Sequence, residues 1–232
     1  MILPVLMLLL CLSYDNILFQ DDFDDGDAEG WHEVSMVKYD VVDGMYRMYG
    51  GYEENHGITF NGDLEGFMST PDYTAVSRVV PEVGVFFGLM CRYSETADYR
   101  IMLVLSYEHQ KLRLYRWGAS GLSVLDDVPF RVELYHEYYV KCRVEGEYFR
   151  GKAWTGNPSD EPGEWMVEAR DTLSSAGSLA LFCAGIPYGR VSLSCRFDDV
   201  VVTGNSSSLR HDTWAGIKYT SCGHGEGSDT SF

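Results

Sequence analysis

The stretch "YYVKCRVEGEYFRGKAW", residues 138–154, holds two apolar alternations on either side of one glycine. Val140, Cys142 and Val144 occupy every second position before Gly146. Since successive side chains of a β-strand point to opposite faces, this spacing predicts two half-buried strands. The short "VEGEYF" connection between them predicts a tight hairpin turn at Gly146.

The same pattern continues through the chain from residue 73 onward. Runs rich in β-branched and aromatic residues alternate with short turns that contain Gly, Pro, Asp or Glu. The other runs are "YTAVSRVV", "VGVFFGLMCRYS", "DYRIMLVLS", "QKLRLYRW", "SLALFCAG" and "VSLSCRFDDVVVTG". No window shows a sustained apolar period of 3.6 residues, and "EARDTLSSAG" leaves room for one helical turn. Many short strands at regular spacing predict an all-β protein, an antiparallel β-sandwich or a barrel.

Composition and charge limit the class of protein. The chain has 232 residues, of which 45% are hydrophobic and 23% are charged. This composition suits one all-β domain with a full core. The net charge of −17 argues against binding to nucleic acid or anionic lipid. We therefore expect neither kind of partner.

The two ends of the chain differ from the middle. Residues 1–13, "MILPVLMLLLCLS", are apolar but too few to span a bilayer. They predict a signal peptide, and hence a secreted or cell-surface protein. The folded domain is expected over residues 14–204, with no transmembrane segment. Residues 205–232 are rich in Gly and Ser, which predicts a flexible tail or a linker to a further domain.

Cysteine usage leaves two alternatives. Five cysteines follow the leader, an odd number without CxxC or zinc spacing. They are Cys91, Cys142, Cys183, Cys195 and Cys222. Four of them lie in phase with apolar neighbours in alternating runs, which predicts buried free thiols acting as small hydrophobic side chains. A disulfide within that set is the alternative.

Five motifs together resemble a concanavalin A-like jelly roll. They are "DDFDDGDAEGW", "VVDGMYRM", "YYVKCRVEGEYFRGKAW", "GSLALFCAG" and "CRFDDVVVTG", and they span residues 18–204. Their order and spacing are similar to the laminin G-like domains of secreted carbohydrate-active and adhesion proteins. The resemblance implies that the first and last strands lie side by side. Phe23 and Phe197 would then both point into the core.

The resemblance also implies a structural calcium ion. Family 16 glycoside hydrolases, which share this fold, hold one between the two ends of the sandwich. The matching ligands here are the carbonyl oxygens of Asp22 and Gly44 and the carboxylate of Asp198, a set that suits Ca²⁺. The other Asp residues near Gly26 are expected to be solvated turn formers. The alternative is that Asp198 only caps a strand end.

An EF-hand is excluded for the acidic segment near residue 26. With Gly26 at position six of such a loop, the ligand at position three would be Phe23. A phenyl ring cannot coordinate calcium.

Catalytic motifs of this fold are absent from the sequence. Its glycosidases place two carboxylates on one strand in a Glu-x-Asp run, and its lyases use Gln-x-His; neither pattern occurs. No catalytic residue is therefore expected. The sequence favours an exported, non-catalytic glycan-binding or adhesion module. The alternatives are a glycoside hydrolase or polysaccharide lyase with an unfamiliar residue set, and a surface or filament protein that self-assembles.

One segment of this acidic chain is basic. Residues 92–152 hold ten Lys and Arg against nine Asp and Glu. Strand alternation places several of these cations, interleaved with Tyr and Trp, on the side facing away from the core. The predicted outward set is Arg92, Arg113, Tyr115, Trp117, Tyr139, Lys141, Arg143, Arg150, Lys152 and Trp154.

Cations interleaved with aromatic rings suit an anionic polysaccharide. The hypothesis is that the outward set forms one face that binds such a glycan. The alternative is a solvated outer sheet face, whose Lys and Arg stems cover apolar surface.

Overall fold

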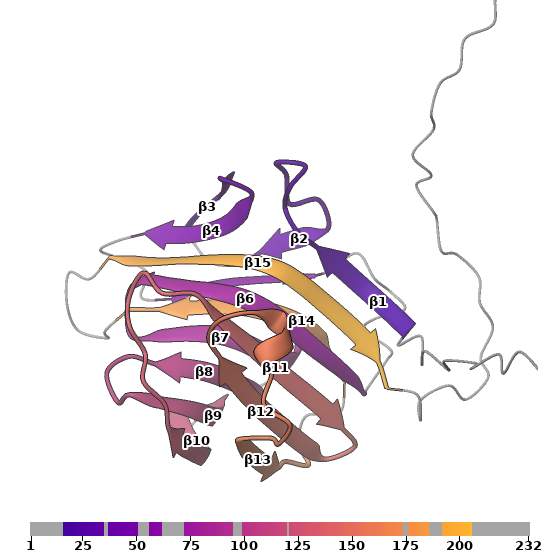
Figure 1. The fold of residues 1–232 in the computed structure, drawn as a ribbon. Helices are drawn as coiled ribbons and strands as arrows, with labels where there is room; N and C mark the ends of the chain where they lie inside the picture. The colour runs from indigo at the N-terminus through magenta and orange to yellow at the C-terminus, as the bar shows by residue number, and fades with distance from the viewer. Residues whose placement is uncertain are drawn as a thin grey trace, which may run out of the picture.

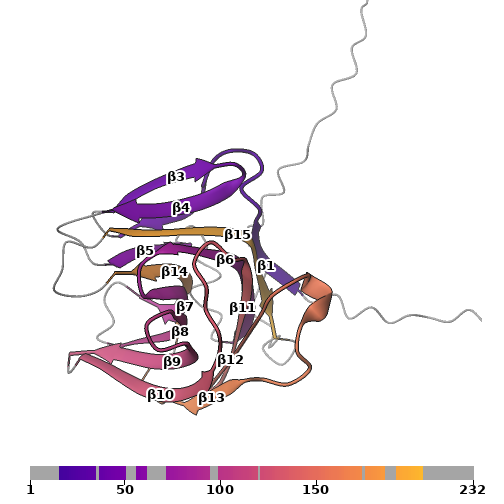
Figure 2. The ribbon, with the colours of Figure 1, turned by 60° about the vertical axis from the view of Figure 1, so that its left-hand side comes forward.

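The computed structural model describes residues 16–34, 37–50, 56–61, 72–94, 99–119, 121–173, 176–185 and 192–205. Within these ranges the chain forms two antiparallel sheets packed face to face (Figure 1, Figure 2), so the predicted all-β sandwich is confirmed. The single helical element there is a 3₁₀ turn, η1 (Pro158–Asp160). The predicted signal peptide and nearly all of the predicted tail lie outside the described residues.

Sheet A contains the hairpin of residues 138–154. Its order is β13-β12-β11-β6-β15-β4-β3, and β1 pairs with β15 beside this path. Its strands are β1 (Asn16–Asp21), β3 (Lys38–Val42), β4 (Met45–Gly50), β6 (Tyr73–Val83), β11 (Tyr138–Glu145), β12 (Tyr148–Trp154), β13 (Val167–Arg170) and β15 (Leu193–Gly204).

Sheet B is built mainly from the middle of the chain. Its order is β10-β9-β8-β7-β14-β5-β2. Its strands are β2 (Trp31–Glu33), β5 (His56–Asn61), β7 (Phe86–Tyr93), β8 (Arg100–Ser106), β9 (Lys111–Gly118), β10 (Gly121–Pro129) and β14 (Ser178–Ala184).

The predicted hairpin at Gly146 is confirmed. Strands β11 and β12 pair antiparallel, and Gly146 has a φ of 58°, a left-handed conformation that glycine adopts without strain. Along β11, residues alternate between buried and half-buried, with Val140 and Cys142 in the core. Alternation in the sequence therefore reported the inward face of this strand correctly.

The two ends of the domain meet as the resemblance implied. Strand β1 pairs antiparallel with β15, and Phe23 and Phe197 are both fully buried in the core between the sheets. Cys91, Cys142, Cys183 and Cys195 are thiols buried in the same core. The predicted burial of these four cysteines is confirmed.

The acidic segment after β1 is a series of side-chain-stabilised turns. The carboxylate of Asp21 accepts hydrogen bonds from the Phe23 amide at 2.9 Å and from the Trp31 indole at 2.7 Å. The carboxylates of Asp25 and Asp27 each accept the backbone N–H two residues further on. This pattern is how Asp stabilises turns, so their predicted role is confirmed.

Candidate functional site

The ten predicted ligand residues do not form one face. Arg113, Tyr115 and Trp117 lie on β9 of sheet B. Six others lie on β11 and β12 of sheet A, namely Tyr139, Lys141, Arg143, Arg150, Lys152 and Trp154. The outer faces of a sandwich point in opposite directions, so the single predicted face is wrong. The basic segment crosses from sheet B to sheet A. Alternation within a strand does not show to which sheet the strand belongs.

Arg92 belongs to neither outer face. The pairing of β7 with β14 contains a bulge. Ser178 pairs with Tyr93, but Ala180, two residues further along β14, pairs with Met90, three residues back along β7. At this bulge Arg92 has a φ of 52° and is only 2% exposed. Its guanidinium lies 5.3 Å from the ring centre of the core residue Phe149. The prediction that Arg92 points outward is therefore wrong.

On the outer face of sheet A, two lysines share one carboxylate. Lys141 and Lys152 are register partners on β11 and β12, and their Nζ atoms lie 2.8 and 2.6 Å from Glu161 Oε1. Burial alone would raise the pKa of Glu161, but hydrogen bonds from both lysines outweigh it, so the pKa lies below its ordinary value. Lys152 also donates to the carbonyl of Pro162 at 2.6 Å. The segment after η1 thus neutralises both cations.

The remaining predicted residues of sheet A are also engaged. Arg143 and Arg150 both pair with Glu145, at 3.2 and 3.4 Å. The rings of Tyr139 and Trp154 stack with centroids 5.3 Å apart, and the buried Trp154 indole donates to a backbone carbonyl. Every predicted cation on this face has a carboxylate partner. This arrangement is the one expected of a structural outer face.

The outer face of sheet B is apolar and strongly curved. A second hydrophobic cluster, separate from the main core, lies there and includes Ile58, Met90, Met102, Val104, Tyr115, Ala180 and Phe182. The rings of His56 on β5 and Trp117 on β9 lie only 5.4 Å apart, although three strands separate β5 from β9. Four strand spacings in a flat sheet would span about 19 Å. The face is therefore concave, with aromatic side chains converging across it.

Arg100 lies at this concave face. The guanidinium carbon of Arg100 lies 5.2 Å from the ring centres of both Tyr93 and Trp117. Among the described residues, no carboxylate lies within ion-pair distance of Arg100, and its Nε is buried without a hydrogen-bond partner. Its side chain is only partly buried. Arg100 is thus positioned to receive an anion from outside the described chain.

Strand alternation did not predict that Arg100 lies on an outer face. In "RIMLVLS" both strand parities are apolar, so alternation could not say which side of β8 faces the core. Arg100 is the register partner of Trp117, which was predicted to point outward. Knowing that β8 pairs with β9 in this register would therefore have placed Arg100 on the same face.

Two other cations, Arg113 and Lys111 of β9, share one carboxylate. Arg113 lies 3.3 Å from Asp127 and donates a hydrogen bond to the Tyr115 hydroxyl at 2.6 Å. Lys111 lies 2.6 Å from the same Asp127 carboxylate. Next to Tyr115, the edge strand β10 leaves Val124 half exposed. Arg100, Trp117 and this apolar rim together form the candidate site.

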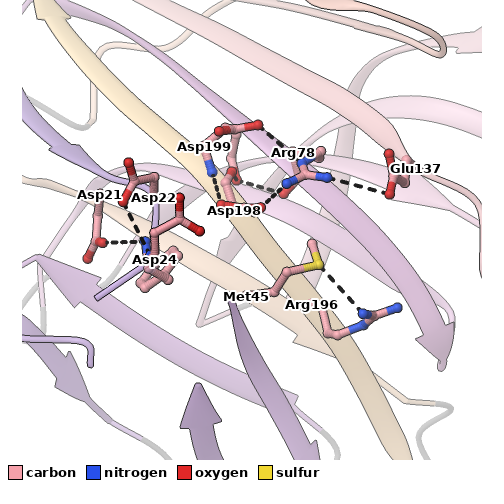
Figure 3. A network of polar contacts seen from close by, with 11 residues as sticks. Asp21, Asp22, Asp24, Met45, Arg78, Glu137, Arg196, Asp198 and Asp199 are labelled. Atoms are coloured by element: carbon pink, nitrogen blue, oxygen red, sulfur yellow. Dashed lines mark hydrogen bonds and ion pairs between the residues drawn. The ribbon is translucent and has the colours of Figure 1, made fainter. Parts of the chain in front are cut away.

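Of the predicted calcium ligands, Asp198 lies against an arginine, and Asp22 belongs to a separate group of acidic turns (Figure 3). One carboxylate oxygen of Asp198 pairs with Arg78, and the other accepts the Asp199 N–H at 2.6 Å. Burial raises the pKa of Asp198 despite these partners. The described residues contain no group of three His, Cys, Asp or Glu side chains that could hold a metal.

Carboxylates lie near the two residues predicted to supply backbone ligands. A Cβ on Gly44 would lie 3.0 Å from an Asp24 oxygen, and Asp22 accepts the Asp24 N–H. With both Asp198 oxygens engaged and a guanidinium adjacent, the residues do not fit a calcium ion in this arrangement. The prediction through Asp22, Gly44 and Asp198 remains a prediction that this geometry does not favour.

Comparison with known proteins identifies the class of fold. No protein-family model matches the chain, and no curated protein matches it. The carbohydrate-binding module CBM66 from Bacillus subtilis is similar in structure, with 15% identity and a TM-score of 0.59 over 75% of this chain and 96% of that one. SCLam, a non-specific endo-β-1,3(4)-glucanase of family GH16, has 11% identity and a TM-score of 0.57 over 87% and 92%.

A longer enzyme contains a similar domain. The xylan β-1,4-xylosidase of Bacillus halodurans C-125 has 13% identity and a TM-score of 0.59, with 79% of this chain and 38% of the enzyme covered. The chain therefore spans about two fifths of that protein. These similarities show a β-sandwich of the kind found in carbohydrate-binding modules and glycoside hydrolases. In the described part of the chain, no helix is long and apolar enough to cross a membrane.

Proposed function

We propose that this protein is an exported, non-catalytic module that binds glycan on the concave outer face of sheet B. The observation that carries the proposal is Arg100, a guanidinium without a carboxylate partner among the described residues, held over the ring of Trp117. Structural similarity to a carbohydrate-binding module supports it.

The chemistry of this face suits an acidic sugar. The apolar side of a sugar ring stacks on an aromatic side chain, which Trp117 supplies on a concave surface. A guanidinium presents paired N–H donors that match a carboxylate or sulfate. Sheet A is not part of the proposal, because Glu145 and Glu161 already neutralise its cations.

Binding without cleavage is proposed because the catalytic runs of this fold are absent from the sequence, and Asp127 on this face is poorly suited to one catalytic role. Retaining glycosidases need two carboxylates about 5 Å apart, one of them able to hold a proton. The hydrogen bond from Lys111 holds the pKa of Asp127 below its ordinary value, and Arg113 adds to this effect. A carboxylate held ionised by two cations is poorly suited to act as the acid.

Calcium is not part of the proposal, since Arg78 holds Asp198.

The test is an array of neutral and acidic polysaccharides probed with the wild-type protein, Arg100→Ala and Trp117→Ala. Arg131→Ala is the matched control, because Arg131 is 80% exposed and pairs with Glu133. We expect binding to acidic glycans that added salt weakens and that both site variants lose. The control should bind normally.

Three outcomes would contradict the proposal. Binding that survives both site variants would exclude this face. Release of sugar fragments would indicate the glycoside hydrolase or lyase alternative. Regular polymers with no glycan bound would indicate self-assembly.

A further inference from the structure

The four buried cysteines form two pairs, and each pair connects the two sheets. Cys91 on β7 and Cys183 on β14 belong to sheet B, whereas Cys142 on β11 and Cys195 on β15 belong to sheet A. Across the core, β7 packs against β11 and β14 packs against β15. The Cys142 thiol is near enough to Cys91 to raise its pKa, and the Cys183 thiol, together with burial, raises the pKa of Cys195.

A buried hydrogen bond to β6 lies beside the first pair. Tyr73 on β6 is fully buried, and its hydroxyl accepts the backbone N–H of Arg92 at 2.8 Å. Two residues along the same strand, Ala75 is the register partner of Cys142. Strand β6 therefore ties the neighbourhood of Cys142 to the residue that follows Cys91.

Close packing of the sheets holds the second pair together. Gly57 is the register partner of Cys183, and Met48 is the register partner of Cys195. A Cβ placed on Gly57 would lie 3.0 Å from the Met48 sulfur, so the sheets approach closely one strand away from the pair. A disulfide needs Cα atoms roughly 4.4–6.8 Å apart, closer than the usual spacing of about 10 Å between sheets. The glycine permits such an approach.

We propose that Cys91 with Cys142, and Cys183 with Cys195, are the sites of two inter-sheet disulfides that form as the chain folds in an oxidising compartment. Four cysteines allow three pairings, and the structure selects this one. Immunoglobulin sandwiches join their sheets by one such bond. The compartment rests on the proposed export, whereas the pairing does not.

The oxidant is a disulfide, either of a thiol–disulfide oxidoreductase or of a small molecule. One cysteine thiolate attacks it to form a mixed disulfide, and its partner then attacks the cysteine sulfur of that bond. The released oxidant carries away two electrons and two protons as a dithiol, or as two thiols. In the folded protein the neighbouring Cys142 thiol and burial raise the pKa of Cys91, so this thiol is unreactive there. The bonds must therefore form before the core closes.

Refolding of the full chain tests the pairing. Cys11 and Cys222 are replaced by Ser, and the denatured protein is refolded in oxidised and reduced glutathione. Remaining thiols are alkylated, and the protein is digested without reduction for mass spectrometry. We expect a loss of two hydrogen atoms per bond and linked peptides joining Cys91 to Cys142 and Cys183 to Cys195. Four alkylated cysteines in a natively folded protein, or any other pairing, would overturn the proposal.

Stability gives a second readout. A reductant should lower the melting temperature of the oxidised protein by on the order of 10 °C or more. The double variant Cys91→Ala with Cys142→Ala should respond about half as much, because it retains one bond. A melting temperature that does not change on reduction would contradict the proposal. This measurement uses the wild-type protein, so it does not depend on whether a variant folds.

Discussion

The two outer faces of this sandwich hold their charges differently. On sheet A, Lys141 and Lys152 share Glu161, so the positive charges are satisfied within the chain. On sheet B, the middle of the face is apolar and buried, and Arg100 has no carboxylate partner among the described residues. A face with satisfied charges stabilises the fold, whereas an unpartnered cation over an aromatic ring is available for a ligand. Cation content alone did not distinguish them.

The largest expected loss of stability follows from a substitution in the second hydrophobic cluster, on the outer face of sheet B. Phe182 is 3% exposed within this cluster, so Phe182→Ala should lower the free energy of unfolding by about 3–5 kcal/mol. Leu122→Ala, at a residue 50% exposed on the same sheet, should change it by less than about 0.5 kcal/mol. Urea denaturation measures both. Similar small losses would mean that the face is ordinary surface.

A smaller effect tests the network on sheet A. Glu161→Gln removes the shared carboxylate and leaves the buried Lys152 without its charged partner, which should cost about 1–2 kcal/mol at neutral pH. Because the folded-state pKa of Glu161 is lowered, its contribution is present above the ordinary value of 4.5 and is lost as the pH falls through the folded pKa. Wild type and variant should therefore converge in acid.

Glu164→Gln is the matched control for that change. Glu164 is exposed in the same segment, so its substitution should leave stability unchanged at every pH. A constant difference between wild type and Glu161→Gln down to strongly acidic pH would contradict the role of the ionised carboxylate.

The smallest expected effect concerns calcium. Since both carboxylate oxygens of Asp198 are engaged, calcium and a chelator should give the same melting temperature. Differential scanning fluorimetry with each addition measures this. A rise with calcium that Asp198→Asn abolishes would restore the predicted metal site.

The sequence predicted sheet A better than sheet B, for a physical reason. On β11, polar and apolar residues alternate, because one face is solvated and the other is in the core. On β8, both faces are buried, so Met102 and Leu103 look alike in the sequence. Alternation therefore located the outward side chains of Lys141 and Arg143 but missed the second apolar cluster and Arg100.

Two further features could not be predicted from alternation within single strands. The bulge that turns Arg92 inward depends on its pairing with β14, a strand more than eighty residues further along the chain. The division of the basic segment between two sheets likewise depends on pairings across the whole domain. Burial of the four cysteines was predictable, whereas their partners required the packing of the sheets.

Binding affinity for an acidic glycan, compared between Arg100→Ala and Arg143→Ala, tests the contrast between the faces most directly. Both substitutions remove one partly exposed arginine from an outer face, but Arg143 is paired with Glu145 on sheet A. Isothermal titration should show Kd rising at least about tenfold for Arg100→Ala, as expected when a charge-assisted contact is lost. Arg143→Ala should bind like the wild type. Equal losses, or a loss confined to Arg143→Ala, would contradict the assignment of the ligand face to sheet B.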